Sequence, residues 1–332
     1  MDDLEKFKQR LIDRENPPEI VEEAIEILEN FYDFIGSRSK TIDKINSDDF
    51  YDFSAKLIRE KRNKSLPYEI IIGYGRFINN PNLIIWGLEV LDGSEVMENF
   101  SKRLEEEFSK EFRDEIFQGI ELPPLGISQK DKPNYTKILI SRFESKVDSK
   151  TCEEFLAKGL RDSYAEWRKP DRERFLKADN FDAFLKDKRK RQIEELEKHR
   201  DEKTLYFTQE INDEVVEYVK SDPSIETGVR NGNVLTVRKI PHEAIKYLNE
   251  KNPDKKSYHY CHCPWAKESF QDGTIDEIPT VFCNCSGGYY KSYWEIILDQ
   301  PVEVKTVKTV MKGDSICEFE VYLPEEIVKD LK

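Results

Sequence analysis

The sequence lacks a long hydrophobic run, a positive charge balance and the cysteine content of a disulfide-stabilised protein. No apolar run reaches the length of about 18 residues that a membrane-spanning helix needs, and the first residues are acidic rather than an apolar leader. We therefore expect no membrane partner, no secretory signal and a cytoplasmic location. The net charge of −14 also disfavours sequence-independent attraction to nucleic acid.

The six cysteines are few for 332 residues, but five of them lie between positions 261 and 317. In a reducing compartment, clustered cysteines more often bind metal or carry out chemistry than form disulfides. Two Cys-x-Cys pairs recur 22 residues apart, and in an extended backbone each pair places both sulfurs on one face. Four thiolates are then available to a zinc ion or an iron–sulfur cluster, with His259 and His262 as substitute ligands. The candidate metal ligands are Cys261, Cys263, Cys283 and Cys285.

Cys285 has a second candidate role, because a glycine-rich turn follows it and leads into a predicted helix at 289–298. A helix N-terminus stabilises a thiolate, so Cys285 is a candidate nucleophile, with His262 and Asp314 as candidate proton carriers. The same turn is suited to a carboxylate, which makes Ser286, Gly287, Gly288 and the nearby Trp265 candidate ligand contacts. Cys317 alternates with apolar residues, which is typical of a buried strand. A purely structural role is the alternative for all five cysteines.

Apolar periodicity predicts an α+β protein that begins with a helical region. Helix-spaced apolar residues recur through residues 1–118, whereas proline-containing turns at 123–124 and 131–134 predict a linker over residues 119–150. Residues 151–332 begin with helices. They continue with a hairpin around Asn231-Gly232 and alternating strands near 301–310 and 316–323, turning at Gly313-Asp314. We therefore expect an all-helical domain at 1–118, a linker at 119–150 and a cysteine-rich α+β domain at 151–332.

The one conspicuous basic run is Lys-Asp-Lys-Arg-Lys-Arg at 186–191, and acidic residues follow it. We interpret this run as a solvated helix face whose charges pair with one another. A patch for anions or nucleic acid is the alternative.

The helical region resembles the core-binding domain of tyrosine recombinases at residues 31–35, 45–53 and 64–77. The resemblance implies contact with DNA. Residues 1–120 nevertheless contain 17 Lys and Arg against 27 Asp and Glu, which is the wrong balance for a phosphate clamp. No histidine is followed by arginine three positions later, as the recombinase catalytic set requires. We therefore favour an interaction domain here.

The motifs at 261–265, 282–288 and 312–319 resemble an uncharacterised cysteine-rich group of bacterial and archaeal proteins. That group is similar to the L-2-amino-thiazoline-4-carboxylic acid hydrolases and, more distantly, to the 4-vinyl-reductase-type small-molecule-binding domain. The resemblance covers residues 150–324. It implies an α+β domain with helices over an antiparallel sheet and a pocket near the cysteines, but it does not select an activity.

We predict a cytosolic protein that binds a metal ion or a small-molecule ligand through its two Cys-x-Cys pairs and carries a helical interaction domain. A hydrolase acting on a small heterocyclic or amide substrate is one alternative. A DNA-associated regulator is the other. The sequence leaves the presence of an activity and the oligomeric state open.

Overall fold

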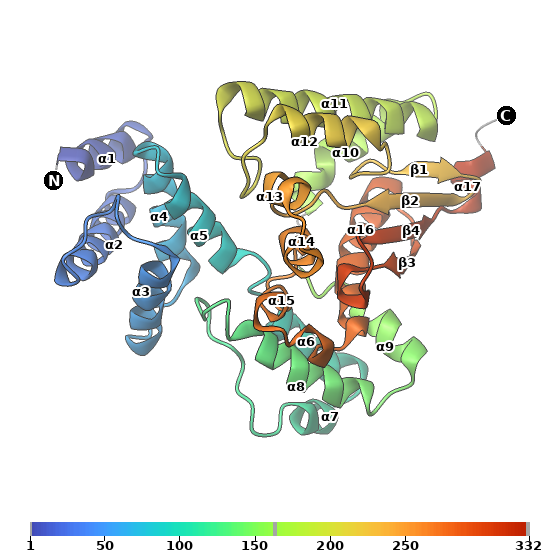
Figure 1. Cartoon of the computed structure of the whole chain (residues 1–332), viewed down its shortest axis with the longest axis horizontal. Helices are drawn as coiled ribbons and strands as arrows, with labels where there is room; N and C mark the ends of the chain where they lie inside the picture. The colour runs from blue at the N-terminus through green and yellow to red at the C-terminus, as the bar shows by residue number, and fades with distance from the viewer. Residues whose placement is uncertain (1, 162–164, 330–332) are drawn as a thin grey trace. The chain divides into compact units, whose positions relative to one another are not determined.

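The computed structural model describes residues 2–161 and 165–329, and the chain divides into two compact units (Figure 1). The first unit holds Met1–Ser94 and Pro123–Lys132, and the second holds Glu95–Leu122 and Pro133–Lys332. The expected class is confirmed: the chain is α+β, with a helical N-terminal region. Within the described ranges, every helix is too short or too polar to cross a membrane.

The first unit is built from helices around an aromatic core. Phe31 packs against Phe50 and Phe53, with ring centroids 6.2 and 4.8 Å apart. The third helix begins with a capping box, in which Asn46 and Asp49 each accept a hydrogen bond from the other's backbone N–H. The helices are α1 (Asp2–Asp13), α2 (Pro18–Ser37), α3 (Ser47–Arg59), α4 (Ser65–Phe77) and α5 (Pro81–Leu91).

The next three helices belong to the second unit, so the boundary differs from the predicted one. They are α6 (Val96–Glu107), α7 (Lys110–Ile116) and α8 (Lys132–Glu144), and α8 occupies much of the predicted linker. Their apolar stripes share one core with the cysteine-rich segment, because Phe100 and Phe143 cluster with Phe155, Trp265 and Phe282. The amphipathic pattern of α6 shows that it buries one face, but not which part of the chain covers that face.

The remaining helices surround a small sheet. They are α9 (Ser149–Leu156), α10 (Ala165–Lys177), α11 (Phe181–Glu202), α12 (Asp213–Ser221), α13 (Ala244–Asn249), α14 (Pro253–Tyr260), α15 (Ser269–Asp272), α16 (Asn284–Leu298) and α17 (Glu325–Lys329). The long α11 and the shorter α12 run side by side, as Figure 1 shows.

The sheet has four antiparallel strands in the order β1-β2-β4-β3. The strands are β1 (Val229–Asn231), β2 (Val234–Arg238), β3 (Glu303–Lys308) and β4 (Glu318–Tyr322). Both predicted hairpins form. Because Asn231 pairs with Val234, the first turn consists of Gly232 and Asn233, one residue later than Asn231-Gly232. The second hairpin contains a short 3₁₀ turn, η3 (Val310–Lys312), before Gly313.

Helix α16 lies against this sheet and brings its N-terminal end to the cysteine segment (Figure 1). Its side chains Tyr290, Trp294 and Ile297 pack with Phe319 of β4 in one buried cluster. Two glycines allow the close approach. A Cβ atom on Gly287 would stand 3.2 Å from Thr306 Oγ1, and one on Gly288 would stand 2.8 Å from the backbone oxygen of Ala157.

We expect Gly288→Ala to destabilise the second unit by about 1–3 kcal/mol, because the new methyl group meets backbone that cannot rotate away. Gly36→Ala is the matched control. A Cβ atom at Gly36, inside α2, meets nothing within 4 Å. Alanine should therefore stabilise that helix by about 0.5–1 kcal/mol. Urea unfolding followed by circular dichroism measures both effects. Equal stability of Gly288→Ala and wild type would contradict the close packing.

Candidate functional site: a thiol-lined cavity

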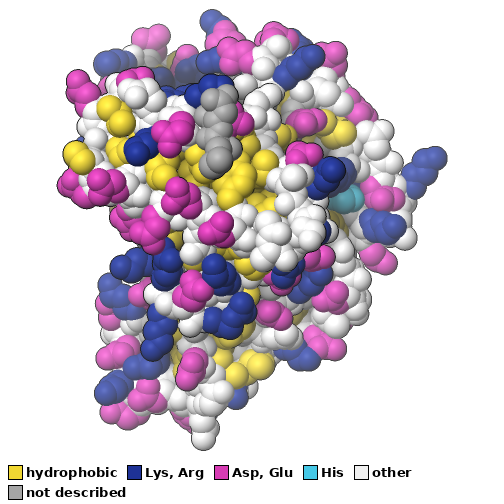
Figure 2. All heavy atoms as spheres, turned by 90° about the vertical axis from the view of Figure 1, so that its left-hand side faces the viewer, with side chains coloured by type: hydrophobic (Ala, Val, Ile, Leu, Met, Phe, Trp, Pro, Cys, Tyr) yellow, Lys and Arg dark blue, Asp and Glu magenta, His cyan; other side chains and the backbone are white. Residues whose placement is uncertain are grey.

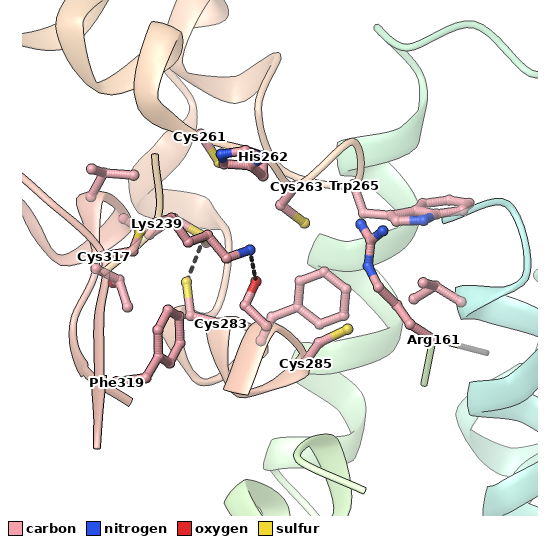
Figure 3. Close-up of a pocket in the computed structure, with 16 residues that line it drawn as sticks. Arg161, Lys239, Cys261, His262, Cys263, Trp265, Cys283, Cys285, Cys317 and Phe319 are labelled. Carbon is pink, nitrogen blue, oxygen red and sulfur yellow. Dashed lines mark hydrogen bonds between the residues drawn. The ribbon is translucent and has the colours of Figure 1, made fainter. Parts of the chain in front are cut away.

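The five clustered cysteines come from three short segments, at 261–263, 283–285 and 317, that meet around one cavity (Figure 3). Cys261 follows the last residue of α14, and Cys263 lies in the turn beyond it. Cys283 ends the 3₁₀ turn η2 (Thr280–Cys283), and Cys285 lies in the first turn of α16. Cys317 directly precedes β4. The cavity therefore collects thiols from the end of one helix, the start of another and the edge of the sheet.

The backbone of the second Cys-x-Cys pair differs from the extended geometry that would place both of its sulfurs on one face. Cys261 has an extended conformation, with φ −67° and ψ 124°, whereas Cys283 has helical angles of −60° and −18° and Cys285 lies inside α16. Helix α16 begins at Asn284, before the glycines, because the Asn284 side chain donates to the carbonyl of Val281 at 2.9 Å and continues the turn. The predicted loop at 286–288 is therefore helical. The sulfurs meet through tertiary folding rather than through strand alternation.

The cavity is small and rich in sulfur. Its volume is about 20 Å³, which is room for one water molecule or one ion. Met311 adds a thioether to the five thiols, with its Sδ 3.2 Å from Cys283 Sγ. Cys317, which the strand pattern assigns to the core, also lines the cavity. Six sulfur-containing side chains thus surround one enclosed space, and apolar groups such as Trp265 and Phe282 complete its walls.

Burial keeps these thiols protonated. It raises the pKa of Cys261 to about 11 and those of Cys263 and Cys285 to about 12. Burial also raises the pKa of Cys283 well above its usual value and raises that of Cys317. At Cys285 this effect outweighs the nearby Arg161, which lowers the pKa. The predicted position of Cys285 beside a helix start is correct, but burial opposes the activation expected from that position.

Two cationic side chains also line the cavity. Lys239 extends from the end of β2, and its ammonium group donates to Ser286 Oγ at 3.3 Å (Figure 3). Its backbone is fixed by Tyr260, whose hydroxyl donates to the Lys239 carbonyl at 2.7 Å. Arg161 lines the cavity near Cys285. In the described part of the chain, no carboxylate lies within ion-pair distance of the Lys239 ammonium group. The cavity therefore favours negative charge.

The predicted proton carriers are not assembled around Cys285. The His262 ring lies beside Cys261, away from Cys285 in Figure 3, and its Nε2 contacts the carbonyl of Ile240 at 2.5 Å. Asp314 is absent from the described lining of the cavity, and its carboxylate accepts the backbone N–H of Thr309 at 2.9 Å. That bond closes the turn before β4. Asp314 therefore makes a local structural contact, and His262 lines the cavity while its Nε2 contacts the Ile240 carbonyl.

The other predicted ligand contacts separate into two kinds. Ser286 and Trp265 line the cavity, and Trp265 is fixed by Thr136 of α8, whose hydroxyl donates to the Trp265 carbonyl at 2.7 Å. Gly287 and Gly288 are buried inside α16 and face the sheet and the chain at Ala157. Gly287 and Gly288 therefore do not form the expected binding site for a carboxylate, because other parts of the protein already fill the space beside both glycines.

Sequence analysis did not identify a buried polar cluster beside His262. The ring of His242 stands 5.2 Å from that of His262, and its Nδ1 lies 3.0 Å from the Lys267 ammonium group. Lys267 also pairs with Glu243 at 3.0 Å, which in turn contacts His259 at 2.9 Å. Burial, followed by the Lys267 charge, holds the pKa of His242 well below its usual value. His259 therefore belongs to this cluster rather than to the thiol cavity.

The basic run at 186–191 is largely occupied by contacts within the protein. Lys188 donates to the carbonyl of Glu226 at 2.6 Å, Arg189 reaches carbonyls at 222 and 225, and Arg191 pairs with Asp171 at 3.0 Å. The run is thus paired, as expected, but partly through buried contacts rather than on a solvated face. Figure 2 shows acidic and basic side chains beside one another on the face that it draws.

The thiol cavity is not a preformed metal site. Over the described ranges, no three Cys, His, Asp or Glu side chains are grouped so that they could hold an ion. Cys261 and Cys263 lie above the cavity in Figure 3, and Cys283 and Cys285 lie below it. Metal ligation through these residues would require the thiols to rotate toward a common centre and lose their protons.

We expect the cavity thiols to alkylate slowly in the folded protein. A shift from the usual value of 9.0 to about 11 or 12 reduces the reactive thiolate at pH 8 roughly 100- to 1,000-fold. Mass spectrometry of iodoacetamide-labelled peptides, with and without urea, measures this ratio. Rapid labelling of Cys285 in the folded chain would instead show an activated nucleophile.

Comparison with models of protein families, with curated proteins and with solved structures finds no match to this chain. The resemblances of the two halves therefore stay predictions.

Proposed function

We propose that the second unit binds a soft metal ion, zinc in the first instance, in the thiol-lined cavity. One observation carries the proposal: six sulfur-containing side chains converge on a space of about 20 Å³, large enough for a single ion. Thiolates and thioethers are the donors that soft and borderline metals prefer. The candidate ligands are Cys261, Cys263, Cys283 and Cys285, with Cys317, Met311 and His262 within the same lining.

The two cations support the same proposal. Four thiolates around a divalent zinc ion carry a net charge of −2, which is costly to bury without compensation. Lys239 and Arg161 line the cavity and supply two positive charges. A cytoplasmic, reducing environment is part of the proposal, because all six cysteines are free and ligation requires reduced thiols. An iron–sulfur cluster uses the same donors but needs more space than the cavity has in this conformation.

Elemental analysis of the full chain, purified under reducing conditions, should find about one zinc ion per chain. Cys263→Ser and Cys285→Ser should bind zinc at least roughly 100-fold more weakly in competition with a chromophoric chelator. Cys152→Ala is the matched control and should bind as the wild type does. Cys152 is buried in α9 and does not line the cavity. Absence of metal, with no zinc uptake on titration, would overturn the proposal.

A small anionic ligand is a second candidate, and Lys239 is the observation that favours it. Its half-buried ammonium group faces the cavity and donates only to Ser286 among the described side chains. A carboxylate would satisfy this cation and pack against the apolar wall at Trp265. The cavity would have to widen for such a ligand, which makes this candidate weaker than the ion.

Native mass spectrometry of gently purified protein separates the two candidates. A retained organic ligand adds a mass that Lys239→Gln removes, because the substitution deletes the charge and keeps the chain length. The control Lys246→Gln should keep the added mass, since Lys246 is exposed and pairs with Glu243. Added mass equal to zinc alone supports the metal, and an unchanged organic adduct in Lys239→Gln contradicts the carboxylate proposal.

The hydrolase and DNA-binding alternatives stay predictions with less support. A hydrolase would need a reactive Cys285, whereas burial raises the pKa of this thiol to about 12, and the His262 ring, although it lines the same cavity, contacts the Ile240 carbonyl. DNA binding through the basic run would compete with the internal contacts of Lys188 and Arg191.

A further inference from the structure

A second cavity, separate from the thiol cavity, lies between α10, α11 and α16. Its volume is about 220 Å³, which approaches the roughly 300 Å³ at which pockets for organic ligands begin. Polar and aromatic side chains line it, and we call it the tyrosine cavity after Tyr206, Tyr289, Tyr290 and Tyr293. Neither the cysteine motifs nor the proposed metal site uses any of these residues.

The charged side chains in the lining of the tyrosine cavity balance one another. Three are cationic and three are anionic: Arg168, Lys188 and Arg191, with Asp171, Glu195 and Glu226. A ligand with a net charge would disturb this balance, and an uncompensated charge is costly in a partly buried space. The lining therefore favours a ligand without a net charge.

Lys188 brings an amine to the wall of the tyrosine cavity. Its Nζ donates to the backbone carbonyl of Glu226 at 2.6 Å and lies 5.3 Å from the ring centroid of Tyr293. Both partners line the cavity, Glu226 from the loop before β1 and Tyr293 from α16. Lys188 itself is a lining residue and is partly exposed. Its amine is therefore held between two other groups of the same wall.

The positive charge of Lys188 is poorly compensated. Among the described residues, no carboxylate lies within ion-pair distance of its Nζ, and its one hydrogen bond goes to a neutral carbonyl. The Asp171 carboxylate is engaged by two arginines and by the Tyr293 hydroxyl. The Glu226 carboxylate accepts the backbone N–H of Ile240 at 3.0 Å. This setting favours the neutral amine over the ammonium form.

Two guanidinium groups act in the same direction. The Arg168 carbon Cζ lies 5.1 Å from the centroid of the Tyr293 ring, and Arg191 follows Lys188 by one turn of α11. Burial first, and then these two like charges, lower the pKa of Lys188 from its usual 10.5 to about 8, although the Glu226 and Asp171 carboxylates oppose the change. Near neutral pH the neutral fraction of the amine is then increased more than roughly 100-fold.

We propose that Lys188 forms a Schiff base with a small uncharged aldehyde or ketone that lies among the tyrosine rings. The amine nitrogen attacks the carbonyl carbon, and both amine protons leave with the carbonyl oxygen as water. A C=N bond replaces the C=O bond, and nothing is oxidised or reduced. Only a neutral lysine amine can make this attack, and burial is the usual way in which proteins provide one. The tyrosine rings offer the rest of the molecule an apolar surface.

Benzaldehyde is the probe, and a brief pulse of borohydride traps any imine by adding hydride to its carbon, which leaves a stable benzylamine. Mass spectrometry of peptides from the full chain then measures how fast each lysine is modified. At about pH 7.5 we expect Lys188 to be modified at least about tenfold faster than Lys190, which lies on the same helix and is 72 % exposed. Modification of Lys188 no faster than that of Lys190 would overturn the proposal.

The pH dependence provides an independent readout. The amount of trapped imine at Lys188 should increase with pH and level off above about pH 8, because the amine is then largely neutral. A yield at Lys188 that still rises steeply at about pH 10 would show an ordinary amine and contradict the proposed activation.

Lys188→Arg keeps the positive charge and removes the amine. Under brief treatment the wild-type chain should gain one benzyl group, Lys188→Arg none, and the matched control Lys190→Arg one. Circular dichroism identifies a variant that fails to fold, and the comparison of rates in the wild type needs neither variant. A single adduct that persists in folded Lys188→Arg would contradict the assignment. Zinc binding should be unchanged in both variants, because the tyrosine cavity shares no lining residue with the thiol cavity.

Discussion

The close packing of α16 against the sheet is the constraint on which both cavities depend. Gly287 lets the helix approach Thr306 of β3, and Gly288 lets it approach the backbone at Ala157. A larger side chain at either position would move the helix axis outward, and every side chain on the helix would move with it. Cys285 and Ser286 at its first turn and the tyrosines further along are positioned by this one contact.

The thiol cavity also shows how burial decides the chemistry of a cysteine. A helix N-terminus and a neighbouring arginine both favour the thiolate of Cys285, yet its pKa is raised to about 12. The free-energy cost of removing the thiolate from water raises this pKa by more than the nearby cations lower it. A metal ion stabilises the thiolate despite burial, because it replaces the proton and supplies a full positive charge at bonding distance. Burial therefore opposes a free thiolate more strongly than it opposes a metal-bound one.

Features that depend on neighbouring residues, such as strands and turns, could be predicted from the sequence. Alternation and turn residues predicted both hairpins. The Cys-x-Cys pairs line one cavity, but not through the extended backbone from which that expectation was drawn. The sequence did not predict that Lys239 and Arg161 line the thiol cavity. Lys239 follows β2 and Arg161 follows α9, and both lie outside the cysteine-rich segment. The predicted boundary also assigned α6 to the N-terminal domain. An amphipathic stripe shows that a helix buries one face, but the burying partner, here Phe143, Phe155 and Trp265, is set by tertiary contacts.

The thiol cavity and the cavity between α10, α11 and α16 have different linings although α16 contributes to both. At about 100° per residue, Cys285, Ser286, Tyr289 and Tyr293 fall within roughly 100° around the axis of α16, so they share one side of the helix. Eight residues separate Cys285 from Tyr293, a rise of about 12 Å along that side. Sulfur donors gather at the first turn, where three other segments bring thiols and Met311. Oxygen and nitrogen donors gather further along, where α10 and α11 cover the helix. The neighbours of α16, rather than the helix itself, therefore determine that sulfur lines one cavity and that oxygen and nitrogen groups line the other.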